Sequence, residues 1–112
     1  MTKREQFNLS FSKAIIDGIV FYFCNATQTG SPQTFATILE GYDKFYAEDL
    51  IEAIDSAQAG QYYVDYHHPD SLTDDFGITI VPPNVVVSSH NYQIPLQVWK
   101  ELMQEWLNFL KS

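Results

Sequence analysis

The spacing of apolar residues changes twice along the chain, and this limits the folds open to it. Up to residue 60 these residues recur at three- and four-residue steps, as on one face of a helix. From Gln61 to His67 they alternate with polar residues, as in a half-buried strand, and after Pro95 the helical spacing returns. Helices followed by hairpin-connected strands predict an α+β domain, with helices on one face of a small antiparallel sheet.

Three N-terminal helices are predicted before residue 60. The first follows a capping Ser10 and covers residues 11–26, where a strand is the less favoured alternative. This helix is apolar nearly all round, so we expect it at the centre of the core. The second covers residues 31–41, with proline at its first turn, and the third covers residues 47–59. The stripe of the first helix comprises Phe11, Ala14, Ile15, Gly18, Ile19, Tyr22, Phe23 and Ala26.

A small three-stranded antiparallel β-meander is predicted next, from residues 61–67, 76–81 and 85–87, the last strand being extended by residues 92–94. A C-terminal amphipathic helix then begins at Pro95. Its apolar stripe comprises Leu96, Trp99, Leu102, Met103, Trp106, Phe109 and Leu110. With 112 residues, the chain is long enough for one core, so residues 1–112 are predicted to form a single domain.

Two residue types in these apolar segments have alternative interpretations. Trp99 and Trp106 lie seven residues apart, on one face of the last helix, where they contribute to the core or, alternatively, to a homodimer contact. Cys24 is the single cysteine and cannot close an intrachain disulfide. Because its neighbours are apolar, we expect a buried structural thiol.

The net charge of the chain limits the classes of partner that it can bind. Its formal net charge is −8, which argues against binding to a nucleic-acid backbone or an anionic membrane surface. Residues 40–75 contain ten acidic residues and one base, Lys44, and so carry a net charge of −9. The other bases lie near the two ends of the chain. This asymmetry favours a cationic partner for the central segment.

The sequence contains no pattern typical of an active site or cofactor site. No serine lies in a Gly-x-Ser-x-Gly turn, and no lysine follows a glycine-rich loop, so we expect neither an enzyme nor a cofactor. The densest group of metal-ligand types is His67, His68 and Asp70, with Asp74, Asp75 and the distant His90. Adjacent histidines on a strand point to opposite faces, so one site would recruit only part of this set. A small metal-dependent enzyme remains the alternative.

Acidic side chains of the third predicted helix share its outer face. Glu48, Glu52 and Asp55 follow at steps of four and three, beside Asp49, and no lysine lies four residues away to compensate them. Like charges at these spacings cost a few tenths of a kcal/mol per pair, which suggests a function. The predicted partner-binding surface comprises Glu48, Asp49, Glu52, Asp55, Tyr63, Asp65, His67, Asp70, Asp74 and Asp75. Solubility alone is the competing interpretation of this surface.

The first residues predict the compartment. Two bases, Lys3 and Arg4, are followed by the mixed segment 7–10 and not by an apolar stretch with a cleavage site. The longest apolar stretch, residues 14–24, contains Asp17 and is well short of the roughly 20 residues of a membrane span. We therefore expect a cytoplasmic protein that is not inserted in a membrane.

The last third of the chain carries a family resemblance. A strand through Tyr92-Gln-Ile-Pro-Leu96 leads into a helix with Trp99, Trp106 and the ending Leu107-Asn-Phe-Leu110. In this order of elements and in its acidity, the chain resembles small bacterial immunity proteins of contact-dependent growth inhibition and related toxin systems. The resemblance implies a stoichiometric inhibitor of a basic toxin domain, often a nuclease, and implies no shared active residues. A nucleic-acid mimic that blocks a defence enzyme is a further alternative.

Overall fold

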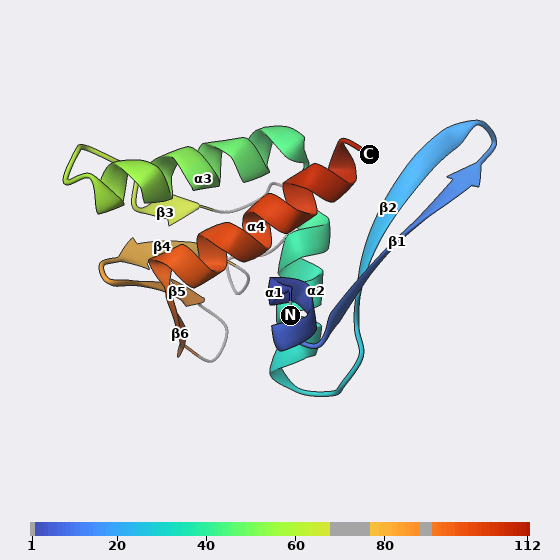
Figure 1. Ribbon diagram of the computed structural model, residues 1–112, viewed down its shortest axis with the longest axis horizontal. Coiled ribbons are helices and arrows are strands. Elements are labelled where there is room, and N and C mark those ends of the chain that lie inside the picture. The colour runs from blue at the N-terminus through green and yellow to red at the C-terminus, as the bar shows by residue number, and fades with distance from the viewer. Residues whose placement is uncertain (1, 68–76, 88–90) are drawn as a thin grey trace.

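The α+β architecture is confirmed by the computed structural model, which describes residues 2–67, 77–87 and 91–112 (Figure 1). In those ranges it contains four helices, a β-hairpin and a four-stranded antiparallel sheet. The elements, in chain order, are α1 (Lys3–Gln6), β1 (Leu9–Ile16), β2 (Ile19–Ala26), α2 (Ser31–Gly41), α3 (Lys44–Gln58), β3 (Tyr66–His67), β4 (Ile78–Val81), β5 (Asn84–Val87), β6 (Tyr92–Pro95) and α4 (Leu96–Leu110).

The predicted meander is present and has one strand more than expected. Its order is β3-β4-β5-β6, with every neighbouring pair antiparallel. Alternate residues of the central strands, among them Ile78, Ile80, Val85 and Val87, are buried, as the spacing predicts. Segment 92–94, expected to extend the last strand, instead belongs to a separate strand that pairs with β5.

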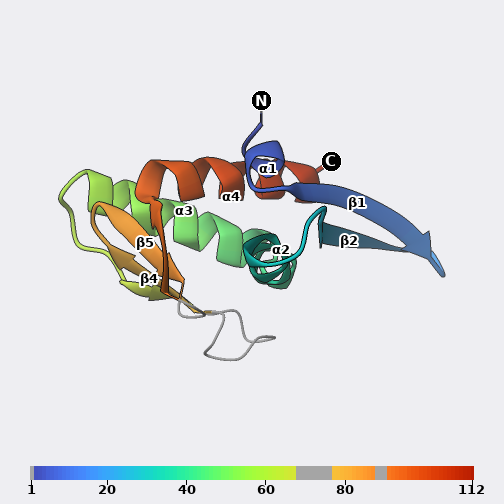
Figure 2. The ribbon, with the colours of Figure 1, turned by 90° about the horizontal axis from the view of Figure 1, so that it is seen from below.

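Helices α3 and α4 lie side by side, with the sheet on one side of them (Figures 1 and 2). Trp99 and Trp106 of α4 are only 0% and 1% exposed, so both belong to the core. The Trp106 indole donates a hydrogen bond to the Tyr42 carbonyl at 2.9 Å. The alternative of a homodimer contact through these tryptophans is therefore contradicted, because neither side chain reaches the surface.

The helix predicted over residues 11–26 is wrong: this segment is the β1–β2 hairpin. Asp17 and Gly18 form its two-residue turn with positive φ angles of 53° and 78°, as in a type I′ turn. Both faces of this hairpin carry apolar side chains, so their spacing also fits a helix. An Asp-Gly pair between β-branched and aromatic residues is the signal that would have identified the hairpin. Cys24 is buried as expected, but in β2.

Among the residues that the structure describes, the contacts of the hairpin with the rest of the protein lie near its base. Phe11 of β1 contacts Trp106 and Phe109 of α4, with ring centroids 5.1 and 5.5 Å apart. On β2, the Cys24 backbone N–H donates to the Glu40 carboxylate of α2 at 3.1 Å. The distal half, residues 14–21, projects away from the body, and we call it the arm (Figures 1 and 2).

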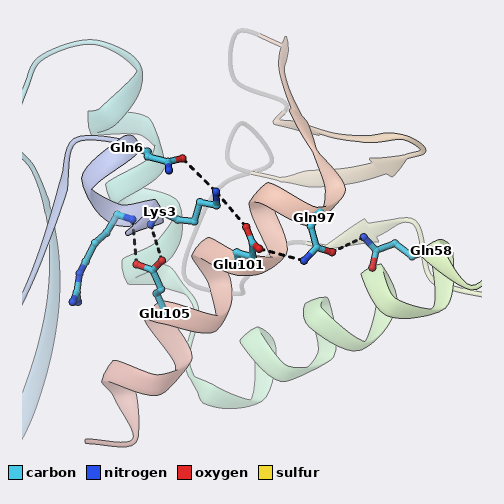
Figure 3. Close-up of polar contacts among 7 residues, drawn as sticks. Lys3, Gln6, Gln58, Gln97, Glu101 and Glu105 are labelled. Carbon is cyan, nitrogen blue, oxygen red and sulfur yellow. Dashed lines mark hydrogen bonds and ion pairs between the residues drawn. The ribbon is translucent and has the colours of Figure 1, made fainter. Parts of the chain in front are cut away.

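Polar contacts along α4 hold the N-terminus against it (Figure 3). The Glu105 carboxylate accepts hydrogen bonds from the backbone N–H groups of Lys3 and Arg4, at 2.7 and 3.2 Å. One turn earlier, Glu101 pairs with the Lys3 ammonium at 3.3 Å. A carboxylate suits the first N–H groups of a helix, since these have no partner within the helix. These contacts account for the ordering of a helix as short as α1.

Candidate functional site: an acidic cleft lined with tyrosines

A cleft of about 500 Å³ lies between α3 and residues 62–67. We call it the acidic cleft. One wall is the outer face of α3, and the other is the segment that leads into β3. Its lining residues are Tyr46, Asp49, Glu52, Ala53 and Ser56 of α3, and Tyr62, Tyr63, Val64, Tyr66 and His67.

The start of α3 determines which side chains face the cleft. The Asp43 carboxylate accepts hydrogen bonds from the Phe45 and Tyr46 N–H groups, both at 2.9 Å, and so caps the helix. This cap starts α3 three residues before the predicted position. Leu50 and Ile54 are fully buried on the opposite side of the helix, so Asp49 and Glu52 face outward.

The second wall differs from the strand predicted over residues 61–67. Only Tyr66–His67 forms a strand, and residues 61–65 have no regular secondary structure. The alternation predicts Tyr63 on the outer face of this strand, with Asp65 and His67, but Tyr63 packs against the core. Tyr62 and Val64, expected on the opposite face, are 90% and 56% exposed, and Asp65 is exposed as expected. The His67 Nε2 atom lies 2.8 Å from the Val64 carbonyl oxygen, within hydrogen-bond distance.

The four acidic residues of α3 divide into two pairs. Glu48 and Asp55 form ion pairs with Lys111 and Lys100, at the end of the chain and in α4. The expectation of an uncompensated helix face is thus wrong for these two, because tertiary packing brings in bases that are distant in sequence. Asp49 and Glu52 have no ion-pair partner within the described ranges. The unpaired charge of this face therefore lies at the cleft.

A buried tyrosine stands behind the lining residues. Tyr42 is 1% exposed, and its ring centroid is 6.4 Å from that of Tyr46. Burial, with a smaller contribution from the Tyr66 phenol, raises the pKa of Tyr42, so its hydroxyl stays protonated. In the part of the chain that the structure describes, this hydroxyl has no hydrogen-bond partner. Tyr42 therefore adds no negative charge beside the acidic cleft.

Four residues of the predicted partner surface line the cleft: Asp49, Glu52, Tyr63 and His67. Glu48 and Asp55 lie beside it on α3, and Asp65 is exposed without lining it. The predicted residues Asp70, Asp74 and Asp75 fall outside the described residues. The prediction missed Tyr46, Ala53, Ser56, Tyr62, Val64 and Tyr66. Tyr46 lies one helical turn before Asp49, and that spacing could have identified it.

The lining groups favour a positively charged ligand. Carboxylates accept charged hydrogen bonds from lysine or arginine, and the faces of tyrosine rings attract the same cations. Within the described ranges, no three His, Cys, Asp or Glu side chains are grouped to hold a metal ion. Of the residues named for the metal-dependent alternative, His67 is described, whereas His68, Asp70, Asp74, Asp75 and His90 lie outside the described residues.

Tyr66 lies where a side chain at Gly77 would have to go. A Cβ built on Gly77 would overlap the Tyr66 ring. We expect Gly77→Ala to displace this ring from the cleft and to lower the free energy of unfolding by about 1 kcal/mol. In a Tyr66→Ala background the same change should cost almost nothing, which urea denaturation of the four variants would measure. An equal cost in both backgrounds would show that the ring does not limit the space at Gly77.

No family model, curated protein or solved structure matches this chain. In the described ranges, none of the helices has the length and apolar character needed to cross a membrane.

Proposed function

We propose that this protein is a cytoplasmic inhibitor of the immunity-protein kind, which binds and neutralises a basic toxin domain, a nuclease in the first instance. The observation that carries the proposal is the acidic cleft. There, Asp49 and Glu52, unpaired within the described ranges, lie with four tyrosines around one concave site. This arrangement supports stoichiometric binding of a cationic protein surface and requires no catalytic group.

The charge and the rings have separate roles in this proposal. A net charge of −8 attracts a cationic domain over a distance and raises the rate of encounter. Within the cleft, Asp49 and Glu52 would pair with a lysine or arginine of the toxin. Tyrosines add large, rigid contact area and are enriched among the residues that dominate binding energy. Occupation of this cleft would hold the chain over the cationic, substrate-binding surface of the toxin.

The experiment uses the basic domain encoded beside this chain, because immunity genes sit next to their toxin genes. We expect its nuclease activity to fall to zero at one equivalent of this protein. We also expect the Kd to rise by at least tenfold between about 50 and 200 mM salt, since screening weakens the attraction between opposite charges. Full nuclease activity at tenfold excess and low salt would refute the proposal. Equal inhibition of unrelated nucleic-acid enzymes would favour the nucleic-acid mimic.

A further inference from the structure

The two walls of the acidic cleft present different kinds of group to a ligand. Asp49 and Glu52 lie on α3, one helical turn apart on the same face. The opposite wall, the segment that leads into β3, contributes the rings of Tyr62 and Tyr66. A side chain that enters between the walls therefore meets carboxylates on one side and aromatic rings on the other. The volume of about 500 Å³ lies within the range of about 300–1,000 Å³ for ligand pockets, so a whole side chain can enter.

Within the described ranges, the chain supplies no cation of its own to the two carboxylates of the cleft. Packing does bring bases to the same helix, because Glu48 and Asp55 pair with Lys111 and Lys100. Neither base reaches the cleft, and the described residues that line it include no lysine or arginine. The cleft is therefore complementary to a cation that comes from a partner.

Three of the four tyrosines that line the cleft are held in place by their neighbours. The Tyr66 ring lies directly against Gly77, where a Cβ would overlap it. The Tyr46 ring contacts the buried Tyr42 ring edge-on, with centroids 6.4 Å apart. The third, Tyr63, packs against the core. Rings that are fixed in advance lose little conformational entropy on binding, so they favour a ligand with a flat face that can stack on them.

We propose that the acidic cleft binds one arginine side chain of the basic partner, in preference to a lysine. The inference rests on the proposed function for the source of this arginine. A guanidinium is planar and carries five N–H donors in a fixed fork, so it can donate to Asp49 and Glu52 while its face stacks on the Tyr66 ring. A lysine ammonium is a compact, strongly hydrated charge with three donors and no flat face. Carboxylates that stand opposite fixed rings therefore select arginine.

The first test compares two short peptides and needs no toxin. Acetyl-Gly-Arg-Gly-amide and acetyl-Gly-Lys-Gly-amide carry the same charge, so the overall attraction to this acidic protein is the same for both. At low salt we expect the arginine peptide to bind about fivefold more tightly, because stacking on a ring adds to the charged hydrogen bonds. An NMR titration of the isotope-labelled protein measures both Kd values. The largest shifts should fall in α3 and in residues 62–67.

The second test removes the stacking face. Tyr66→Leu should bring the two Kd values to within about twofold of each other, whereas Tyr66→Phe, which keeps the ring, should retain the preference for arginine. Gly77→Ala should also reduce the preference, because it displaces the Tyr66 ring without removing it. Phe45→Leu is the matched control: Phe45 is 66% exposed on α3, but it does not line the cleft, and the Lys44 ammonium already lies 5.2 Å from its ring centroid. This control should leave both Kd values unchanged. Circular dichroism would verify that each variant is folded.

Three results would overturn the proposal: equal Kd values for the two peptides, no binding of either peptide at millimolar concentration, or a preference for arginine that survives both Tyr66→Leu and Gly77→Ala. None of them decides the inhibition experiment, because a toxin that presents lysines can still pair with the carboxylates. Conversely, a ring-dependent preference for the arginine peptide, together with a toxin that stays fully active, would support the arginine site and refute the proposed function alone.

Discussion

Trp106→Ala is expected to lower the free energy of unfolding by about 3–5 kcal/mol, a large part of the total stability of a small domain. The side chain is 1% exposed, and its ring packs against Phe11 and Phe109 at centroid distances of 5.1 and 5.9 Å. Its removal leaves a cavity and also leaves the Tyr42 carbonyl without its indole donor. Urea denaturation followed by far-UV circular dichroism measures the loss.

A pair of matched variants separates the hydrogen bond from the packing. Trp99 lies two turns earlier on α4 and is also fully buried, but its indole N–H has no partner within the described ranges. Both Trp→Phe changes remove similar volume, so Trp106→Phe should cost about 1 kcal/mol more than Trp99→Phe. Equal costs would mean that the bond to Tyr42 contributes nothing net.

Trp106→Ala should also affect the arm. Phe11 and Tyr22 anchor the hairpin to the C-terminal end of α4, through Trp106 and Phe109. Loss of one of these rings weakens the base from which the arm projects. Amide hydrogen exchange should therefore accelerate in the hairpin more than in β4 and β5. Uniform acceleration across the chain would show that the hairpin and the core open as one unit.

The parts of the fold predicted from sequence are those in which one face is apolar and the other polar. The ranges 31–41, 47–59 and 96–110 follow helical spacing, and α2, α3 and α4 form there, with caps that shift α3 by a few residues. Strands β4 and β5 follow from β-branched runs joined through Pro82-Pro83. The hairpin at 9–26 was missed because its distal half is apolar on both faces, and such a pattern does not distinguish a period of two from one of 3.6.

The candidate site was predicted only in part, because local spacing does not record how the elements pack. The helical spacing predicts that Asp49 and Glu52 lie on the outer face of α3. The ion pairs that neutralise Glu48 and Asp55 depend on how α4 and the end of the chain pack against α3. Local spacing carries no information about that packing. The second wall was missed because residues 61–65 alternate like a strand but leave the sheet, which exposes Tyr62 and buries part of Tyr63.

Because α3 carries two carboxylates with ion-pair partners and two without, substitutions on this one helix allow the sharpest test of the cleft. The double variant Asp49→Asn/Glu52→Gln should raise the Kd for the basic toxin domain about 100-fold or more. Each charged hydrogen bond lost costs about 1.5–3 kcal/mol, and 1.4 kcal/mol corresponds to a factor of ten in Kd. Isothermal titration calorimetry at low salt measures the change. The free protein should remain folded, because both side chains are exposed and have no ion-pair partner within the described ranges.

Glu48→Gln/Asp55→Asn is the matched control on the same helix. It changes the net charge by the same two units, so the long-range attraction of the toxin falls equally in both variants. It removes the ion pairs with Lys111 and Lys100 and thereby costs up to about 1 kcal/mol of stability for each exposed pair. A Kd that rises much more for the cleft variant than for this control would locate binding at Asp49 and Glu52. Equal increases would mean that only the overall charge matters, and the acidic cleft would not be the binding site.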